Sequence, residues 1–181
     1  MGEENTPIRV AEGKCINSNR RWLRQFKDPV GCMHMSHATE NDTGASWWTD
    51  LAETLAGHEQ QMIAFRRHMH RNPEASGDEY KTTELVRQAF GQVGLEPRLM
   101  EDRRGLILDL DLGAPEDTYI AVRADLDCVE VDDQKSVEWR SCNDGLCHAC
   151  GHDAHTSMAL HAALAIHEHA DAIRSLNPNA N

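Results

Sequence analysis

Cysteine and histidine residues crowd together in the last third of the chain, and this cluster constrains the fold more than any other feature. Four of the six cysteines and three histidines lie in one stretch: Cys128, Cys142, Cys147, His148, Cys150, His152 and His155. Cys150 and His152 are separated only by Gly151, so an irregular loop can bring a thiolate and an imidazole to the same ion. The spacing predicts a metal site with Cys150 and His152 as ligands.

The charge balance and the hydrophobic pattern exclude two classes of partner. The chain has 181 residues, with 18 Lys and Arg against 30 Asp and Glu, so its formal net charge is −12 and it lacks the cationic surface that binds phosphate backbones. No apolar run reaches the length of about 18 residues that is needed to cross a bilayer. We therefore expect neither nucleic acid nor a membrane as a partner.

The first residues indicate the compartment. Glu3, Glu4 and Glu12 stand in a stretch where a secretory signal would need an apolar run. A cytoplasmic location is therefore expected. In that reducing compartment, clustered cysteines favour metal binding or catalysis over disulfide bonds.

Other uses of the cysteines remain open. Cys142, Cys147 and Cys150 have the C-x4-C-x2-C spacing of plant-type iron–sulfur proteins, but the further cysteine that this arrangement needs does not follow Cys150. The same three cysteines with one histidine can instead bind a structural zinc ion. The alternative to an enzyme is thus a non-catalytic metal-binding module, or a structural zinc or iron–sulfur protein.

Hydrophobic residues at helical spacing predict two helices in the middle of the chain. The first, of about twenty residues, should begin at a capping box that starts at Asp50 and should end just before Pro73. The second should begin at a capping box formed by Ser76 and Glu79. We expect Gly94 to end it, because glycine readily adopts the left-handed conformation that closes a helix.

The remaining pattern predicts an α/β class. Residues 106–112 alternate between apolar and polar, residues 119–124 are mainly apolar, and both segments are predicted to be strands. A third helix is expected over residues 158–173. Asp125 and Asp127 follow the second strand, at the kind of edge where open α/β sheets bind ligands.

Three strings of residues resemble the amidohydrolase branch of the M20 metallopeptidase family, which includes N-acyl-amino-acid amidohydrolases, hippurate hydrolases and auxin-conjugate hydrolases. They occur in the order and approximate spacing of that family. They are FRRHMHRNPE at residues 65–74, VRADLD at residues 122–127 and GLCHACGHDAHT at residues 145–156.

The resemblance implies a fold and a domain organisation. It implies a zinc-peptidase-like catalytic domain in which helices pack on a mixed sheet, truncated here before the lid domain. Residues 1–48 are expected to form an irregular extension, and residues 49–181 the N-terminal part of the catalytic domain.

The resemblance also implies a site. Cys150 and His152 would be metal ligands, and Asp125 would accept a hydrogen bond from a ligating imidazole, expected to be that of His152. Two divalent ions per complete site are implied, of zinc, manganese, cobalt or nickel. The implied partner is a small N-acyl amino acid whose amide bond is cleaved by a metal-activated water, and the complete protein is expected to be able to form a homo-oligomer.

The paired glutamates that supply the general base and a further ligand in that family should follow the third helix. They do not occur before Asn181, and neither do the later histidine ligands. We therefore expect little or no hydrolysis from these 181 residues alone.

Overall fold

The computed structural model describes residues 46–115 and 118–176. The helices are α2 (Ser46–Gly57), α3 (Glu59–Arg71), α4 (Tyr80–Gly91), α5 (His152–Glu168) and α6 (Ala170–Ser175), and the strands are β1 (Arg98–Leu99) and β2 (Leu106–Ile107). Most of the extension predicted for residues 1–48 lies outside the described residues, but its last three residues already belong to α2.

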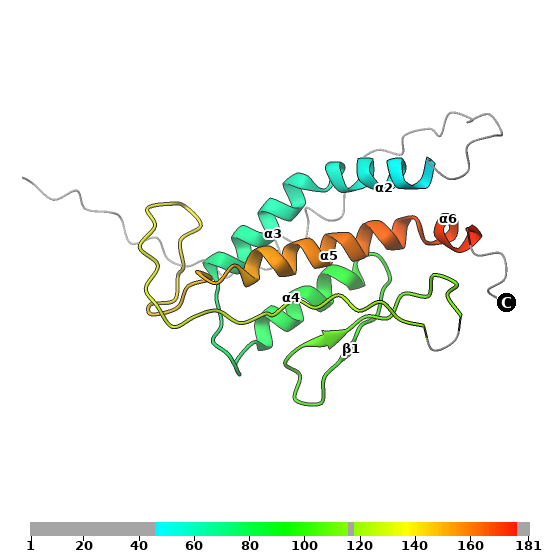
Figure 1. Cartoon of the computed structure of the whole chain (residues 1–181). Helices are drawn as coiled ribbons and strands as arrows, with labels where there is room; N and C mark the ends of the chain where they lie inside the picture. Colours follow the sequence, from blue (N-terminus) through cyan, green and yellow to red (C-terminus); the bar gives the residue numbers. More distant parts are fainter. Residues whose placement is uncertain (1–45, 116–117, 177–181) are drawn as a thin grey trace, which may run out of the picture.

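Helices α3, α4 and α5 supply the buried core. In Figure 1, α5 runs beneath α2 and α3, against which it packs, and α4 lies on its other side. The core side chains recur three or four residues apart along each helix, as one-sided burial requires. They are Phe65 and Met69 from α3, Leu85, Val86, Ala89 and Phe90 from α4, and Leu160 and Leu164 from α5.

The single helix expected from Asp50 to Pro73 is divided in two. It begins earlier, at Ser46, so that Asp50 lies inside the helix instead of capping it. A turn at His58 separates α2 from α3, directly after Gly57, a residue type that weakens helices. The hydrogen-bond ladder nevertheless continues, because the His58 amide donates to the Thr54 carbonyl at 3.0 Å. The end at Arg71, just before Asn72 and Pro73, agrees with the prediction.

The N-terminus of α4 is capped by a residue other than the one expected. The sequence points to Ser76, but Ser76 is exposed, and the carboxylate of Glu74 accepts the helix donors instead. Its Oε2 accepts from the Thr82 amide at 2.7 Å and from the Thr82 hydroxyl at 2.8 Å, and its Oε1 accepts from the Lys81 amide at 3.2 Å. A carboxylate beside free helix amides is stabilising because the helix N-terminus carries a partial positive charge.

The predicted strands are largely not formed as strands. β2 keeps only Leu106 and Ile107 of the expected 106–112 segment, and it pairs antiparallel with β1. Residues 119–124 have no strand partner among the described residues. A strand needs a neighbour to accept its backbone hydrogen bonds, so an apolar pattern alone does not make one. Tyr119, Ile120 and Val122 are accordingly 81%, 96% and 78% exposed.

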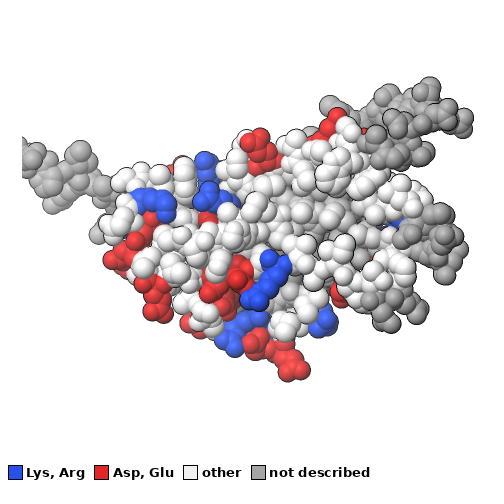
Figure 2. Space-filling view, viewed as in Figure 1, with Lys and Arg blue, Asp and Glu red and all other residues white. Residues whose placement is uncertain are grey.

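The third predicted helix starts six residues early. α5 begins at His152 and not at Met158, and α6 follows it after a short break. No described helix is both long and apolar enough to span a membrane. The face shown in Figure 2 carries its charged side chains mainly on its left-hand and lower parts, and the area over α5 is largely uncharged.

Residues 125–151 form a long loop that is fastened to the connection between α3 and α4. The Cys128 amide donates to the Glu74 carbonyl at 2.9 Å, and the Cys142 amide donates to the Arg71 carbonyl at 2.8 Å. Within the loop, Val129 and Cys147 exchange a pair of backbone hydrogen bonds. These bonds fix the chain on both sides of the cysteine and histidine cluster.

The cap on α4 can be tested by removing one carboxylate. Glu74→Ala should lower the free energy of unfolding by about 1–2 kcal/mol, the usual cost of losing a helix cap. Ser76→Ala, the matched control, should change it by less than about 0.5 kcal/mol because Ser76 is exposed. Urea unfolding followed by circular dichroism measures both. Equal losses from the two variants would show that Glu74 is not the cap.

Candidate metal centre

Cys150 and His152 lie at the N-terminus of α5. His152 is the first residue of the helix, and the Cys150 side chain is exposed in the turn before it. Gly151, between them, has φ = 93°, a left-handed conformation that costs a residue with a Cβ atom about 1–2 kcal/mol. The glycine in the Cys-Gly-His string is therefore what lets the chain turn sharply and present both side chains at the helix end.

The imidazole of His152 is held by Asp127. Its Nδ1 lies 3.0 Å from Asp127 Oδ1 and 3.1 Å from the Asp127 carbonyl oxygen. Both oxygens can only accept, so Nδ1 carries the hydrogen, and Nε2 is left with its lone pair. A histidine that ligates a metal typically has this arrangement, in which the other ring nitrogen donates to a carboxylate. The Nε2 lone pair of His152 is thus directed away from Asp127, where it can accept a cation.

Asp125 does not make the hydrogen bond that the sequence suggested. Its Oδ2 lies 3.9 Å from Nε2 of His152, beyond hydrogen-bond distance, and its Oδ1 accepts from Arg123 at 2.9 Å. The carbonyl of Asp125 accepts from the Thr156 hydroxyl at 2.9 Å, which attaches this segment to α5. The hydrogen-bonding role foreseen for Asp125 therefore falls to Asp127, and the Asp125 carboxylate faces the lone-pair side of the ring.

His148 is a third imidazole in the same loop. It is 3% exposed, and neither of its ring nitrogens has a hydrogen-bond partner among the described residues. Burial lowers the pKa of His148 to about 4, so the ring is neutral at pH 7 and keeps a lone pair. Buried nitrogens without partners are costly, and a bound cation is one way to satisfy them. This stretch thus contains an exposed thiol, an oriented imidazole and a buried neutral imidazole, all donors that divalent metals accept, but the donor atoms of the three do not all lie within 4.8 Å of one another.

The residue after His152 anchors the whole turn. The side chain of Asp153 is fully buried, and its Oδ2 lies 2.8 Å from Nδ1 of His70 and 3.2 Å from Nε of Arg66, both on α3. Its Oδ1 accepts from the Ala154 amide at 2.9 Å, within the first turn of α5. The start of α5 is therefore tied to the C-terminal part of α3 by a buried ionic network.

A second group of donors was not foreseen from the sequence as a site. His70, Asp133 and Cys147 are buried, and one ligand atom of each lies within 4.8 Å of those of the other two. Burial alone would raise the pKa of Asp133, but the amides of Ser141 and Lys135 and the Lys135 ammonium outweigh it and hold the pKa well below its usual range. Burial, with the nearby Asp133 carboxylate, raises the pKa of the Cys147 thiol.

The alternative metal site of three cysteines is not assembled. Within residues 46–115 and 118–176, the group around Cys147 is the one set of three metal-competent side chains with mutually close donor atoms, and it contains neither Cys142 nor Cys150. Cys128, Cys147 and Cys150 are free thiols. A zinc or iron–sulfur site built from Cys142, Cys147 and Cys150 is therefore not what this fold forms.

The chain is similar to known proteins over part of its length. Residues 121–179 match peptidase family M20/M25/M40. The N-acetyl-L-cysteine deacetylase of Bacillus subtilis (strain 168) is 34% identical over 120 residues, which are 66% of this chain and 29% of that protein. The crystal structure of the Bacillus subtilis YXEP protein, described as a dinuclear metal binding peptidase from the M20 family, matches with a TM-score of 0.58 and 30% identity over 62% of this chain and 32% of the other.

The chain is thus similar to peptidase family M20, in sequence over residues 121–179 and in fold to a solved member. Its helices and small antiparallel sheet form part of the α/β catalytic domain of that family, as the match to a solved member shows. The chain spans less than a third of the length of either of these relatives. A Rhodococcus jostii (strain RHA1) protein named as a glutamate–cysteine ligase is also 38% identical over 146 residues, 81% of this chain, but those residues are only 16% of that protein.

The Asp153 network predicts a large loss of stability on neutralisation. Asp153→Asn should lower the free energy of unfolding by about 1–3 kcal/mol, because it removes the carboxylate that the buried Nδ1 of His70 bonds to. The ion pair with Arg66 should account for less of this loss than the contact with His70, since the Arg66 side chain is half exposed. Asp144→Asn, at an exposed position of the same loop, is the control and should change stability by less than about 0.5 kcal/mol. Denaturant unfolding in the presence of a chelator measures both, and similar values for the two would contradict the anchoring role.

Proposed function

We propose that this chain contributes a divalent-metal site to a metal-dependent amidohydrolase that cleaves the amide bond of N-acylated amino acids or similar conjugates. The observation that carries the proposal is the paired presentation of Cys150 and His152 at the start of α5, with Nδ1 of His152 held 3.0 Å from Asp127. The name of the related N-acetyl-L-cysteine deacetylase supports the substrate class.

In this proposal Cys150 and His152 are the ligands that the chain supplies. A divalent ion there would lower the pKa of a bound water and polarise the substrate carbonyl, which are the two things that amide hydrolysis needs. Two ions of zinc, manganese, cobalt or nickel per complete site are proposed, and the description of the YXEP protein as dinuclear supports that number. The thiolate favours the softer of these ions.

The two aspartates have separate proposed roles. Asp127 fixes the tautomer and direction of the His152 ring. Asp125, whose Oδ2 lies 3.9 Å from Nε2, adds negative charge on the side where a cation would bind. Arg123 holds the other oxygen of Asp125 and so keeps this carboxylate in place.

The remaining parts of the proposal concern the protein in the cell. We propose that it acts on a small molecule in the cytoplasm, and that the complete protein forms a homo-oligomer. A metal-binding module without catalysis is the second candidate, since the buried, unpartnered His148 adds a donor that hydrolysis does not require.

The activity test uses the native protein as its source makes it. Release of free amino acid from N-acetyl-L-cysteine and other N-acetyl amino acids should depend on divalent metal, stop on chelation and return when manganese or zinc is added back. Cys150→Ala and His152→Ala should each lower kcat/KM by about 100-fold or more, and Cys142→Ala should leave it unchanged. Metal binding without turnover of any N-acyl amino acid would favour the second candidate.

The roles of the two aspartates are separated by metal affinity. Asp127→Ala should weaken binding by roughly 10- to 100-fold, as expected for losing the carboxylate that orients a ligating histidine. Asp125→Ala should have a smaller effect, because its carboxylate makes no hydrogen bond to the ring. Competition with a coloured chelator measures both affinities. A larger loss from Asp125→Ala would reverse the assignment and restore the prediction made from the sequence.

A further inference from the structure

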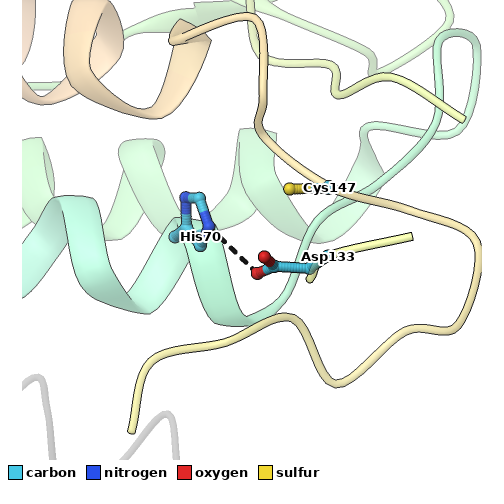
Figure 3. A group of neighbouring side chains, drawn as sticks. All are labelled: His70, Asp133 and Cys147. Carbon is cyan, nitrogen blue, oxygen red and sulfur yellow. Dashed lines mark hydrogen bonds and ion pairs between the residues drawn. The ribbon is translucent and has the colours of Figure 1, made fainter. Parts of the chain in front are cut away.

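The buried group of His70, Asp133 and Cys147 brings together three segments of the chain. His70 comes from the last turn of α3, Asp133 from the middle of the long loop, and Cys147 from the end of that loop before α5. Figure 3 shows the three side chains pointing toward one another. They are 2%, 4% and 2% exposed, so a polar group among them cannot be left without a partner.

The ammonium group of Lys135 already lies beside this group of three side chains. The ammonium nitrogen of Lys135 lies 3.3 Å from His70 Nε2, 3.3 Å from Asp133 Oδ1 and 3.9 Å from Cys147 Sγ. One cation thus faces one donor atom of each of the three buried side chains. The Lys135 side chain is 48% exposed, so it can turn out into water without rearrangement of the core.

The donors are held in position by a surrounding shell of hydrogen bonds. Asp153 fixes Nδ1 of His70 at 2.8 Å, which directs Nε2 toward the other two side chains. The carboxylate of Asp133 accepts from the Ser141 amide at 3.0 Å and from the Lys135 amide at 3.1 Å. Metal-ligating histidines and carboxylates typically have such partners, which orient them before the metal binds.

We propose that His70, Asp133 and Cys147 form a second divalent-cation site, separate from the Cys150 and His152 pair, and that it takes zinc. One sulfur, one nitrogen and one oxygen donor are the set that zinc accepts in tetrahedral coordination, and hard cations such as magnesium or calcium disfavour the sulfur. On binding, the Cys147 thiol loses its proton to solvent as the zinc–thiolate bond forms, and the Lys135 ammonium turns out into water. A water molecule completes the fourth position.

The consequence is structural. Zinc at this site ties the end of α3 to both arms of the loop that carries Cys150 and His152. It stabilises the folded chain by mass action, because the three ligands come together only on folding. The proposal does not depend on the proposed hydrolysis, since none of its ligands belongs to the catalytic pair.

The experiment uses the purified 181-residue chain with the Cys150→Ser and His152→Gln substitutions, so that the catalytic pair cannot bind. Zinc titration by calorimetry should still give one bound ion per chain. Adding Cys147→Ser should weaken this binding by about 100-fold or more, and adding Cys142→Ser, the matched control, should not change it. Adding Lys135→Met should strengthen it by about tenfold, because the competing positive charge is removed.

Cobalt(II) gives a readout that does not depend on stability. In the same background it should show a thiolate-to-cobalt charge-transfer band, and that band should vanish with Cys147→Ser and remain with Lys135→Met. Absence of stoichiometric zinc binding in the background would overturn the proposal, and so would zinc binding that is insensitive to Cys147→Ser or weakened by Lys135→Met. In those cases the lysine ammonium is the permanent cation of the site. Failure of the proposed hydrolysis would instead leave this zinc binding intact, because the background already lacks Cys150 and His152.

Discussion

The buried carboxylate of Asp153 is the interaction on which the functional end of the molecule depends. It lies in the first turn of α5 and contacts His70 and Arg66 on α3. It therefore joins the two helices where the loop of residues 125–151 ends and α5 begins. A fully buried charge is tolerated only when it is paired, and here an imidazole, a guanidinium and a backbone amide share it. Because Asp153 directly follows His152, the position of His152 is set by the packing of its neighbour.

The same aspartate links the two groups of metal-competent side chains. Asp153 directly follows His152, whose ring is held by Asp127. The Asp153 carboxylate also holds Nδ1 of His70, and this directs Nε2 of His70 toward Asp133 and Cys147. The hydrogen bonds of the loop to Arg71 and Glu74 supply the rest of the framework. The loop is therefore well ordered without regular secondary structure, because its backbone groups bond to the ends of helices instead of to a sheet.

The helices could be predicted from the sequence because their causes are local. Phe65 and Met69 lie four residues apart on one face, Pro73 prevents continuation of α3, and Gly94, with φ = 80°, closes the turn after α4. The cap of α4 could not be predicted, since Glu74 lies eight residues before the amide it accepts from and outside the usual spacing. Most of the predicted strand of residues 106–112 does not form, for a related reason. Strand pairing depends on partners distant in sequence, and the alternation of apolar and polar residues within one segment does not supply them.

The candidate site, like the fold, could be predicted from the sequence only in part. The Cys150 and His152 pair is visible in the sequence because a single glycine separates the two residues, whereas the choice between Asp125 and Asp127 is not. Both aspartates come just after the predicted strand of residues 119–124, so the sequence pattern offered no means to distinguish them. The group around Cys147 was beyond sequence reasoning altogether, since His70 and Asp133 are 63 positions apart and meet only through the fold.

Residues 118–127 are held next to the candidate site although the strand predicted for residues 119–124 has no partner among the described residues. The first of them are exposed and apolar. The last of them are fixed to α5 by the Thr156 hydroxyl and by Nδ1 of His152. The contacts that hold this segment to α5 therefore lie at its C-terminal end, at Asp125 and Asp127. The Asp127 carboxylate and the Asp125 carbonyl are held by α5 itself, so the geometry around His152 depends on helix packing and on Asp153, not on strand pairing upstream.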